Sequence, residues 1–444
     1  MKTASRNFIA ALLIIVAASS CTSVYMASPA FTVSLRAVNI KHYLPGLQSF
    51  AWATEGNKLL LIGGRTEGFH GLPSDDTSFN VKKANDSIFV INLVDYSYRA
   101  LALSKKDTSF FQFSSSNMEF KQAGDTLYLV GGFGTRDTAN KQSNYTFNTI
   151  TSVKISEMIH QVEMQNGGDP DRAILNRASS PFLAVTGGEL IKINNLFYLM
   201  FGQHYSGIYD IDNSGKYTSA VRQFRFNNNN TISDTLSFID TNLHRRDLNV
   251  APLIQNEGLS YAGYGGVFTK DISSYNHPVY LSFAGGKVIV KPDTLTQITN
   301  QYECAKAFIY DPSSKSDITI LFGGIGKFQY NEKTKKWENG DHGAPLPFVK
   351  SITQLVYQNG YSQQKIQLPP SGLEMPALIG SDAIFIPDSS LIYSEHIIDF
   401  SKLKPGSSPI GIIFGGIKST FPTSSGPYPT FLNKIVYWVY LNYK

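Results

Sequence analysis

The sequence predicts an all-β fold in which six repeated units stack radially as the blades of a β-propeller. The first observation is a recurring apolar strand that ends in a glycine pair, whose second glycine stands at positions 64, 132, 202, 266, 324 and 416. The second is that the runs around each pair are short, rich in β-branched and aromatic residues, and bounded by Gly, Asn, Asp, Ser or Pro, which is typical of strands. Such units cannot bury their faces singly, whereas a ring of them can.

The first copy of the pattern, LLLIGGRTEGFHG at 59–71, also has to be compared with a phosphate-binding loop. A dinucleotide fingerprint needs three glycines spaced G-x-G-x-x-G and a following helix whose amides hold the phosphates. The chain continues instead with RTEGFHGLPSDD, which contains turn residues and no helical period. We therefore expect the glycines to permit close strand packing and a turn with positive φ.

Each unit is expected to supply three or four antiparallel strands. Apolar runs precede the glycine pairs, as in LQSFAWAT, NMEFKQAG, PFLAVTGG and ECAKAFIY, and others follow, as in DSIFVINL, NTITSVKI, TQLVYQ and NKIVYWVY. The best helical candidate is the brief MIHQVEMQ at 158–165. The run GSDAIFIPDSSLIYSEHIIDF at 380–400 is interpreted as a long first hairpin of the sixth blade, although the interval between 324 and 416 could also hold a seventh blade.

The two ends of the chain are expected to meet in one blade. NKIVYWVYLNYK at 433–444 finishes the chain after only three strands of the sixth unit, and FTVSLRAVNI at 31–40 precedes the first unit. An N-terminal strand that completes the last blade would remove an open sheet edge. We therefore predict that residues 31–444 form a single six-bladed β-propeller closed by the N-terminal strand in the last blade.

The repeat resembles the kelch repeat, in which a strand ending in Gly-Gly is followed by a loop and a strand introduced by a pair such as Asn-Asp. Gly63 and Gly64, followed by ANDSIFVINL at 84–93, carry this resemblance, which covers most of the mature chain. The late tryptophan of the family occurs only patchily, as Trp337 and Trp438, and the third copy has Phe201 in place of its first glycine. The resemblance implies that the loops leaving the glycine pairs and those entering the inner strands surround one mouth of a central channel, where ligands usually bind.

Residues 1–20 have the pattern of an export signal of the lipoprotein type. Lys2 and Arg6 precede an apolar run at 8–18 that is too short to span a bilayer, and AASSC ends it at Cys21. A cysteine after small residues resembles a bacterial lipobox, which implies a diacylglycerol on the thiol; an ordinary secretory peptide is the alternative. Residues 21–30 are expected to form a tether. We therefore expect an outer membrane lipoprotein of the bacterial cell envelope that faces the periplasm or the cell surface.

The composition fits an extracytoplasmic β protein, with 13% aromatic and 16% charged residues. The net charge of +5 is spread over 444 residues without a dense Lys/Arg run, which disfavours nucleic-acid binding. Cys304, in YECAKAFIY, is expected to be a buried spectator, not a nucleophile. The eight histidines show no metal-like spacing, so neither a metal nor a cofactor is expected.

Cationic residues dominate the loops expected around the channel mouth. Guanidinium groups there would suit a carboxylate, sulfate or phosphate, while solvated or carboxylate-paired arginines are the alternative. HRRD at 244–247 is the densest charged group and ranks first, and Tyr302 with Lys306 enters the fifth unit. The candidate ligand-binding residues are Arg65, Glu67, His70, Arg136, Arg177, His244, Arg245, Arg246, Lys327 and Lys418.

Two function hypotheses follow. The main one is a lipid-anchored module without enzymatic activity that binds or scaffolds a protein or glycan partner, with an acidic sugar among the ligands considered. The alternative is a carbohydrate-active enzyme, because the repeats resemble those of a six-bladed kelch-like mutarotase of bacteria that epimerises sialic acid at its anomeric carbon. Acid–base catalysis of that kind needs a carboxylate and an arginine for the substrate acid, which Glu67, His70, His244 and Arg245 could supply. A hydrolase with two opposed carboxylates is not supported, since no pair of acids stands out in the sequence.

Overall fold

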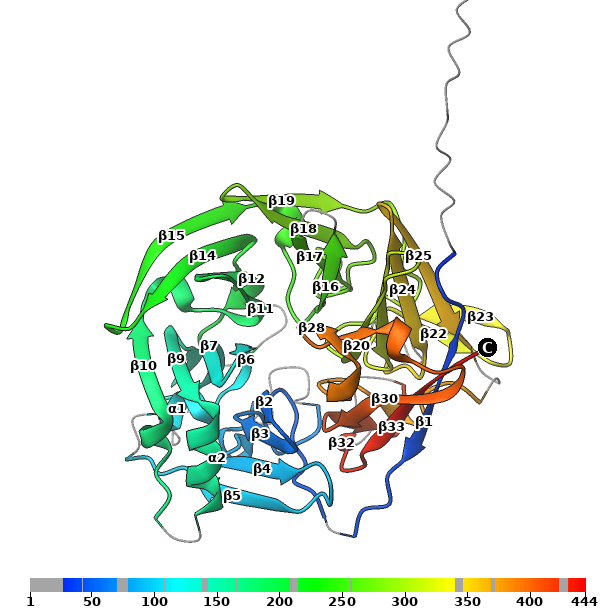
Figure 1. Ribbon diagram of the computed structural model, residues 1–444. Coiled ribbons are helices and arrows are strands. Elements are labelled where there is room, and N and C mark those ends of the chain that lie inside the picture. The colour runs from blue at the N-terminus through cyan, green and yellow to red at the C-terminus, as the bar shows by residue number, and fades with distance from the viewer. Residues whose placement is uncertain are drawn as a thin grey trace, which may run out of the picture.

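The computed structural model is a ring of antiparallel sheets around a central axis (Figure 1). The expected signal at 1–20, Cys21 and His70 lie outside the residues that the structure describes. No helix of the described part is long and apolar enough to cross a membrane. The described residues are 27–41, 43–69, 79–106, 109–137, 143–164, 167–207, 209, 215–255, 258–339, 346–368, 372–422 and 430–444.

The first three sheets follow one another along the chain, each beginning with its innermost strand. The first contains β2 (Ala51–Glu55), β3 (Lys58–Ile62), β4 (Ser87–Asn92) and β5 (Tyr98–Ala102). The second contains β6 (Ser116–Ala123), β7 (Thr126–Thr135), β9 (Thr149–Lys154) and β10 (Ile174–Ser179), with β8 (Asn144–Thr146) on β7. The third contains β11 (Thr186–Ile193), β12 (Leu196–His204), β14 (Ala220–Asn227) and β15 (Thr231–Ile239), with β13 (Lys216–Tyr217) on β12.

Three further sheets complete the ring. The fourth contains β16 (Asn249–Gln255), β17 (Gly258–Tyr264), β18 (Val279–Ala284) and β19 (Lys287–Pro292). The fifth contains β20 (Ala305–Asp311), β21 (Ser316–Phe322), β24 (Ile352–Gln358) and β25 (Tyr361–Gln367), extended by β29 (Ile397–Asp399) and β28 (Ile392–Ser394). The sixth contains β27 (Ile384–Pro387), β30 (Gly406–Phe414), β33 (Tyr437–Tyr443) and β1 (Thr32–Ala37).

Smaller elements decorate this ring in the described part of the chain. Two small sheets are formed by β22 (Phe328–Asn331) with β23 (Lys336–Asn339), and by β26 (Leu378–Ile379), β31 (Ile417–Ser419) and β32 (Thr430–Leu432). The α-helices there are α1 (Phe110–Phe113) and α2 (Ile155–Glu163). The helix α2 overlaps the best helical candidate of the sequence, 158–165, and begins three residues before it.

Every main sheet packs between two others, which explains why its strands are apolar on both faces. In β3, Leu59 and Leu61 contribute to one apolar cluster, and Leu60 and Ile62 contribute to another on the opposite face. Such a cluster lies between each pair of successive sheets, including the sixth and the first. Burial of apolar area on both faces stabilises each sheet only when its neighbours are present.

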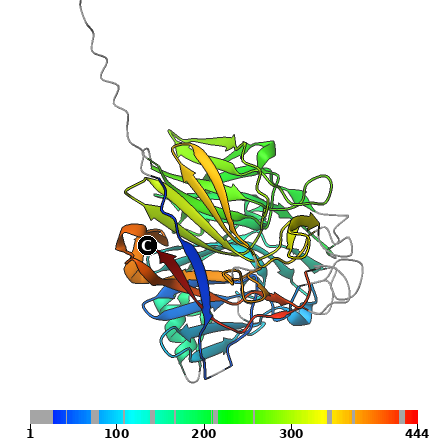
Figure 2. The same ribbon diagram turned by 90° about the vertical axis from the view of Figure 1, so that its right-hand side faces the viewer.

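The first and last strands of the described chain lie side by side. β1 pairs with β33 in an antiparallel register that runs from Thr32 opposite Asn442 to Ala37 opposite Tyr437. Figure 2 shows the blue β1 beside the dark red β33. The chain segment 31–40 therefore contributes a strand to the sheet that also contains the C-terminal strand.

The glycine pairs connect neighbouring sheets. The backbone N–H of Gly64 donates to the carbonyl of Ser115 (2.8 Å), which precedes the second sheet, and the N–H of Gly416 donates to the carbonyl of Leu47 (2.8 Å), which precedes the first sheet. Gly64 has a φ of +88°, and a Cβ atom there would lie 2.4 Å from the carbonyl oxygen of Gln48. A side chain would therefore clash with backbone, in line with the close packing expected from the sequence.

The all-β prediction is confirmed, but the interpretation of 380–400 needs a correction. This run supplies β27 to the sixth sheet, whereas its hairpin β28–β29 belongs to the fifth sheet, where β29 pairs in parallel with β20. Ile397 and Ile398 are 1% and 0% exposed, so the hairpin buries apolar surface while covering the inner edge of β20. An uncovered strand edge is an open hydrogen-bonding surface, and the hairpin occupies that edge of β20.

Candidate active site in the central channel

One position recurs at the start of each innermost strand and lines the channel. Its occupants are Ser49, Asn117, Gly187, Asp247, Glu303 and Asp382, and all six have a left-handed backbone with φ between 38° and 69°. All six line the same central cavity. We call this set the channel ring. Left-handed residues other than glycine are uncommon, and such a conformation at an equivalent site in every sheet aims the side chains in a common direction.

The position of the channel ring follows from the glycine pairs. The residue before each ring residue pairs with the residue after a glycine pair, as Gln48 does with Arg65, Arg246 with Val267, and Tyr302 with Ile325. The chain then has to turn from this bridge into the innermost strand, and the left-handed residue makes that turn. The same local geometry therefore places one residue from each sheet at the channel.

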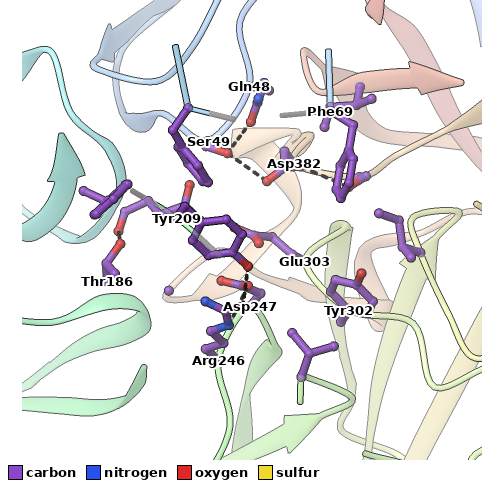
Figure 3. Close-up of a pocket in the computed structure, with 18 of the residues that line it drawn as sticks. Gln48, Ser49, Phe69, Thr186, Tyr209, Arg246, Asp247, Tyr302, Glu303 and Asp382 are labelled. Carbon is purple, nitrogen blue, oxygen red and sulfur yellow. Dashed lines mark hydrogen bonds and ion pairs between the residues drawn. The ribbon is translucent and has the colours of Figure 1, made fainter. Parts of the chain in front are cut away.

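Three neighbouring ring residues are acidic and form a carboxyl cluster. Glu303 is hydrogen-bonded to the carboxylates of both Asp382 and Asp247. Ser49 Oγ donates to Asp382 Oδ1 (2.9 Å), and Ser381 Oγ donates to Asp382 Oδ2 (3.0 Å). Figure 3 shows the side chains of the cluster and of Ser49 gathered around one space. The cluster joins three acids that lie far apart in the sequence.

Burial raises the pKa of every carboxyl group in the cluster. The pKa of Glu303 lies well above its usual range because the group is buried and faces the negative charges of Asp382 and Asp247. Burial also raises the pKa of Asp382, although hydrogen bonds from Ser49 and Ser381 favour its ionised form. The pKa of Asp247 is raised by burial and lowered in part by Arg246. Repulsion between the negative charges of neighbouring buried carboxylates favours retention of a proton in the cluster. Glu303, whose pKa lies well above its usual range, holds this proton best.

A buried arginine lies beside the carboxyl cluster. Arg246 is 3% exposed, its NH2 group donates to the Tyr209 hydroxyl (2.6 Å), and its Nε lies 3.5 Å from Asp247 Oδ2. Aromatic rings surround its guanidinium, with Tyr209 and Phe268 at 5.4 and 5.2 Å. In the described part of the chain, Arg246 Nε and the Gln203 Oε1 atom are buried without a hydrogen-bond partner, and both residues line the cavity. The cavity thus contains a donor and an acceptor that a bound molecule could satisfy.

The channel has two chambers that meet at the carboxyl cluster. The glycine-side chamber, lined by the channel ring and the residues that follow the glycine pairs, has a volume of about 80 Å³. The hairpin-side chamber, lined by residues of the innermost strands and by Glu395 and His396 of the β28–β29 hairpin, has a volume of about 390 Å³. Ser49, Glu303 and Asp382 line both chambers. The proton-sharing acids are thus accessible from either side.

The structure brings two of the predicted cations to the glycine-side chamber, Arg65 and Arg246. Arg65 is 5% exposed, its Nε donates to Glu67 Oε1 (2.7 Å), and its NH2 donates to the carbonyl of Asn80 (2.8 Å). Burial lowers the pKa of Arg65, while Glu67 raises it. Arg65 is therefore a paired arginine at the wall of the chamber, and Glu67 is its partner.

Within the highest-ranked group, HRRD, only Arg246 and Asp247 reach the chamber. His244 stacks on Tyr217 with 4.0 Å between ring centroids. Arg245 is 3% exposed and donates to the carbonyls of Asn242 (3.1 Å) and His277 (2.8 Å), so it holds loops together.

The remaining predicted cations lie apart from the glycine-side chamber. Arg136 is exposed over the Tyr145 ring and shares a surface pocket with His204, Lys216 and Arg222. Arg177 lies in β10, where its Nε donates to Thr151 Oγ1 (3.1 Å). Lys327 Nζ lies 5.5 Å from the Phe328 ring, and Lys418 lines another surface pocket. The predicted cations therefore do not converge on one site.

The sequence interpretation missed Ser49, Asn117, Glu303 and Asp382. No pair of acids had stood out, because the members of the carboxyl cluster are brought together only by the ring of sheets. Cys304 follows Glu303 directly and is 4% exposed, and burial raises its pKa to about 12, as fits a spectator thiol. No group of three or more His, Cys, Asp or Glu side chains in the described residues is arranged to hold a metal ion.

No protein-family model and no curated protein matches this sequence. The chain is similar to the solved structure titled "Structure of YjhT", with a TM-score of 0.48 and 12% identity, over 89% of this chain and 99% of that chain. At such an identity, a likeness of this kind concerns the fold alone.

Proposed function

We propose that this protein is an enzyme that uses general acid–base catalysis in its central channel to interconvert the anomers of an acidic sugar. The observation that carries this proposal is the carboxyl cluster, in which Glu303 retains a proton next to an aspartate. An acid and a base held side by side is what the opening of a cyclic hemiacetal requires. The hypothesis of a binding or scaffolding module gives no role to three buried acids that share a proton.

The proposed reaction needs only proton transfers. Protonated Glu303 donates its proton to the ring oxygen of the sugar while ionised Asp382 accepts the proton of the anomeric hydroxyl, and the bond between the anomeric carbon and the ring oxygen breaks. Rotation in the open-chain form exposes the other face of the carbonyl. Ring closure reverses both proton transfers and restores Glu303 and Asp382, so no cofactor is consumed.

Arg246 is the proposed partner of the substrate carboxylate. Its guanidinium is buried at the chamber wall and has an Nε–H without a hydrogen-bond acceptor among the described residues. A guanidinium binds carboxylates through paired N–H groups, which gives both attraction and orientation. This residue therefore favours an acidic sugar over a neutral one, with the substrate carboxylate in the glycine-side chamber.

The finer architecture is part of the same proposal. The six main sheets would be six kelch-like blades, closed by β1 in the sixth. Apolar clusters between all successive sheets and the pairing of β1 with β33 support this assignment. Residues 31–444 would then form one propeller domain, and the channel would be its axis.

The proposed location rests on the sequence alone. A signal at 1–20, a lipid on Cys21 and a tether at 21–30 would anchor the propeller at the outer membrane. The substrate would then be an extracytoplasmic sugar acid. Mass spectrometry of the membrane fraction would detect the diacylglyceryl cysteine, whereas an unmodified or absent Cys21 would contradict the anchor.

The proposed reaction is tested by following the anomers of freshly dissolved sialic, glucuronic and galacturonic acids by ¹H NMR. The wild-type protein should accelerate equilibration of at least one of them, Asp382→Asn should lower the rate about 100-fold or more, and Arg246→Lys should mainly raise KM. Asp317→Asn, which alters a buried carboxyl group outside both chambers, is the matched control and should retain the rate. Equilibration no faster with protein than without it, for all these acids, would refute the proposal.

A further inference from the structure

The hairpin-side chamber has the size and lining of a ligand site of its own. Its volume of about 390 Å³ falls within the range of roughly 300–1,000 Å³ that is usual for small-molecule pockets. Aromatic side chains form much of its wall, namely Trp52, Phe120, Phe308 and Phe385. Rings of this kind pack against the apolar C–H faces of small molecules.

The β28–β29 hairpin lies across one end of this chamber. His396 stacks on Trp52 of the first sheet with 5.3 Å between ring centroids. Glu395 forms an ion pair with Lys121 of the second sheet. Because the hairpin is part of the fifth sheet, these contacts reach across the channel axis, as the position of β28 near the centre of Figure 1 illustrates. The chamber is thereby enclosed between the hairpin and the carboxyl cluster.

The chamber contains one buried hydroxyl that has no hydrogen-bond partner in the described part of the chain, together with two oppositely charged side chains. The hydroxyl belongs to Tyr261, which is 4% exposed. Glu189 and Lys306 also line the chamber and attract each other, yet no ion pair within 4 Å joins them. A buried hydroxyl left unpaired costs stability, so its retention in a cavity points to a ligand.

The charges in the chamber select the class of ligand. An anion would satisfy Lys306 but face Glu189 and the acids of the carboxyl cluster, and a cation would face Lys306. A hydroxyl group both donates and accepts, so a ligand with several hydroxyls can serve Glu189, Lys306 and Tyr261 together. An apolar ring face opposite the aromatic wall completes the match to a sugar.

We propose that the hairpin-side chamber binds a neutral monosaccharide, with Tyr261, Lys306 and Glu189 as its hydrogen-bonding residues and Trp52 as part of its aromatic wall. This site is distinct from the acidic-sugar site proposed for the glycine-side chamber. It depends on the geometry of the chamber alone and holds whether or not the acid–base reaction takes place. Glu303 and Asp382 line both chambers, so a neutral sugar in this site would lie next to the carboxyl cluster.

Titration of the folded protein with glucose, galactose, mannose and their N-acetylated amino derivatives tests this site. Trp52 is one of three tryptophans and the one that lines the chamber, so at least one sugar should change the tryptophan fluorescence, and Trp52→Phe should abolish that response. Tyr261→Phe, Lys306→Met and Glu189→Gln should each weaken binding about tenfold, in keeping with the loss of one hydrogen bond to a buried ligand. Tyr310→Phe, at a β20 residue that lines neither chamber, is the matched control.

The outcomes separate this site from the proposed reaction. Arg246→Lys, at a residue that lines the glycine-side chamber and not the hairpin-side chamber, should impair turnover of a sugar acid while neutral-sugar binding persists, so failure of either proposal leaves the other measurable. Circular dichroism identifies a variant that does not fold, and three independent substitutions keep the test decisive. The proposal is overturned if no sugar of the panel binds, if binding is indifferent to all three substitutions, or if only sugar acids bind and Arg246→Lys alone weakens them.

Discussion

The channel ring divides into an acidic half and a neutral half on the same backbone. Ser49, Asn117 and Gly187 have φ values of 54°, 51° and 69°, and Asp247, Glu303 and Asp382 have values of 53°, 38° and 52°. The two halves therefore differ in side-chain chemistry, not in the way the sheets present it. A repeated fold supplies equivalent backbone positions, and the candidate active site arises where these positions carry different side chains.

The three acids occupy consecutive sheets and not alternate ones, so their carboxyl groups lie close enough together to share a proton. Adjacent ring positions bring the carboxyl groups within hydrogen-bond distance of Glu303. Close like charges in a buried site retain a proton, and a retained proton provides a general acid. The neutral half leaves room and hydrogen-bond donors around this cluster, as Ser49 does for Asp382.

The largest expected effect comes from neutralising the acidic half at its centre. Glu303→Gln keeps the size of the side chain but removes the transferable proton, so turnover of the sugar acid should fall about 10²- to 10⁴-fold. The free energy of unfolding at pH 8 should rise, because a buried acid among like charges no longer has to be accommodated. NMR anomer exchange and denaturant titration measure the two effects, with Asp317→Asn as control. A fall in both activity and stability would indicate a structural role instead.

The next effect is on the pH dependence of stability. Burial raises the pKa of Glu119, which is outside the ring, from 4.5 to about 8, and burial also raises the pKa of the three ring acids. The folded state therefore holds protons that the unfolded state releases, so stability should be greatest in mild acid and decline as the pH rises from about 4.5 to about 8.

Glu119→Gln separates the contribution of Glu119 from that of the ring. Glu119 Oε1 accepts a hydrogen bond from the backbone N–H of Gly188 (2.8 Å), which glutamine can preserve. In denaturant titrations between pH 5 and 9, the free energy of unfolding of this variant should decline less with rising pH than that of the wild type. The decline that remains should come from the ring acids. A wild-type stability that rises over this interval would exclude protonated carboxyl groups in the channel.

The fold was largely predictable because its signals are local. Glycine pairs and doubly apolar strands such as Leu59 to Ile62 arise from the packing of each sheet between two others, and this packing is the same in every repeat. The helix α2 was found for the same reason, since its amphipathic period lies within nine residues. The assignment of the hairpin β28–β29 was wrong because its partner, β20, is about 90 residues away in the chain.

The site was less predictable because its signal changes position between repeats. The ring residue stands 15 residues before the second glycine in the first three repeats, at 49, 117 and 187, but 19, 21 and 34 residues before it at 247, 303 and 382. Longer inner hairpins and the insertion after β27 account for the difference. The sequence predicts cations in the loops around the channel mouth, yet the residues directly after the glycine pairs are Arg65, Phe133, Gln203, Val267, Ile325 and Ile417.

A smaller effect is expected when the neutral half receives a charge. Asn117→Asp introduces an acid that tolerates the left-handed backbone and faces Asp247, with which Asn117 is hydrogen-bonded. Repulsion should lower the free energy of unfolding at pH 8 by about 1–3 kcal/mol, and by less at pH 5, where the added carboxyl keeps its proton. Asn117→Ser at the same pH values separates the charge from the loss of the amide. An equal loss at both pH values for Asn117→Asp would contradict an electrostatic origin.

The smallest effect tests why the third ring position has no side chain. A Cβ atom on Gly187 would lie 2.3 Å from Asp247 Oδ1, so the absence of a side chain leaves space for the carboxylate of the neighbouring sheet. Gly187→Ala should cost about 1 kcal/mol for its left-handed backbone and a further increment for displacing Asp247. Gly285→Ala is the matched control, because Gly285 also has a positive φ of 58° but nothing within 4 Å of its added Cβ atom. The contrary outcome is an equal loss of stability in both variants by denaturant titration, with an unchanged rate of anomer exchange in Gly187→Ala. In that case Gly187 serves only the turn, and the acidic half of the ring does not depend on the missing side chain.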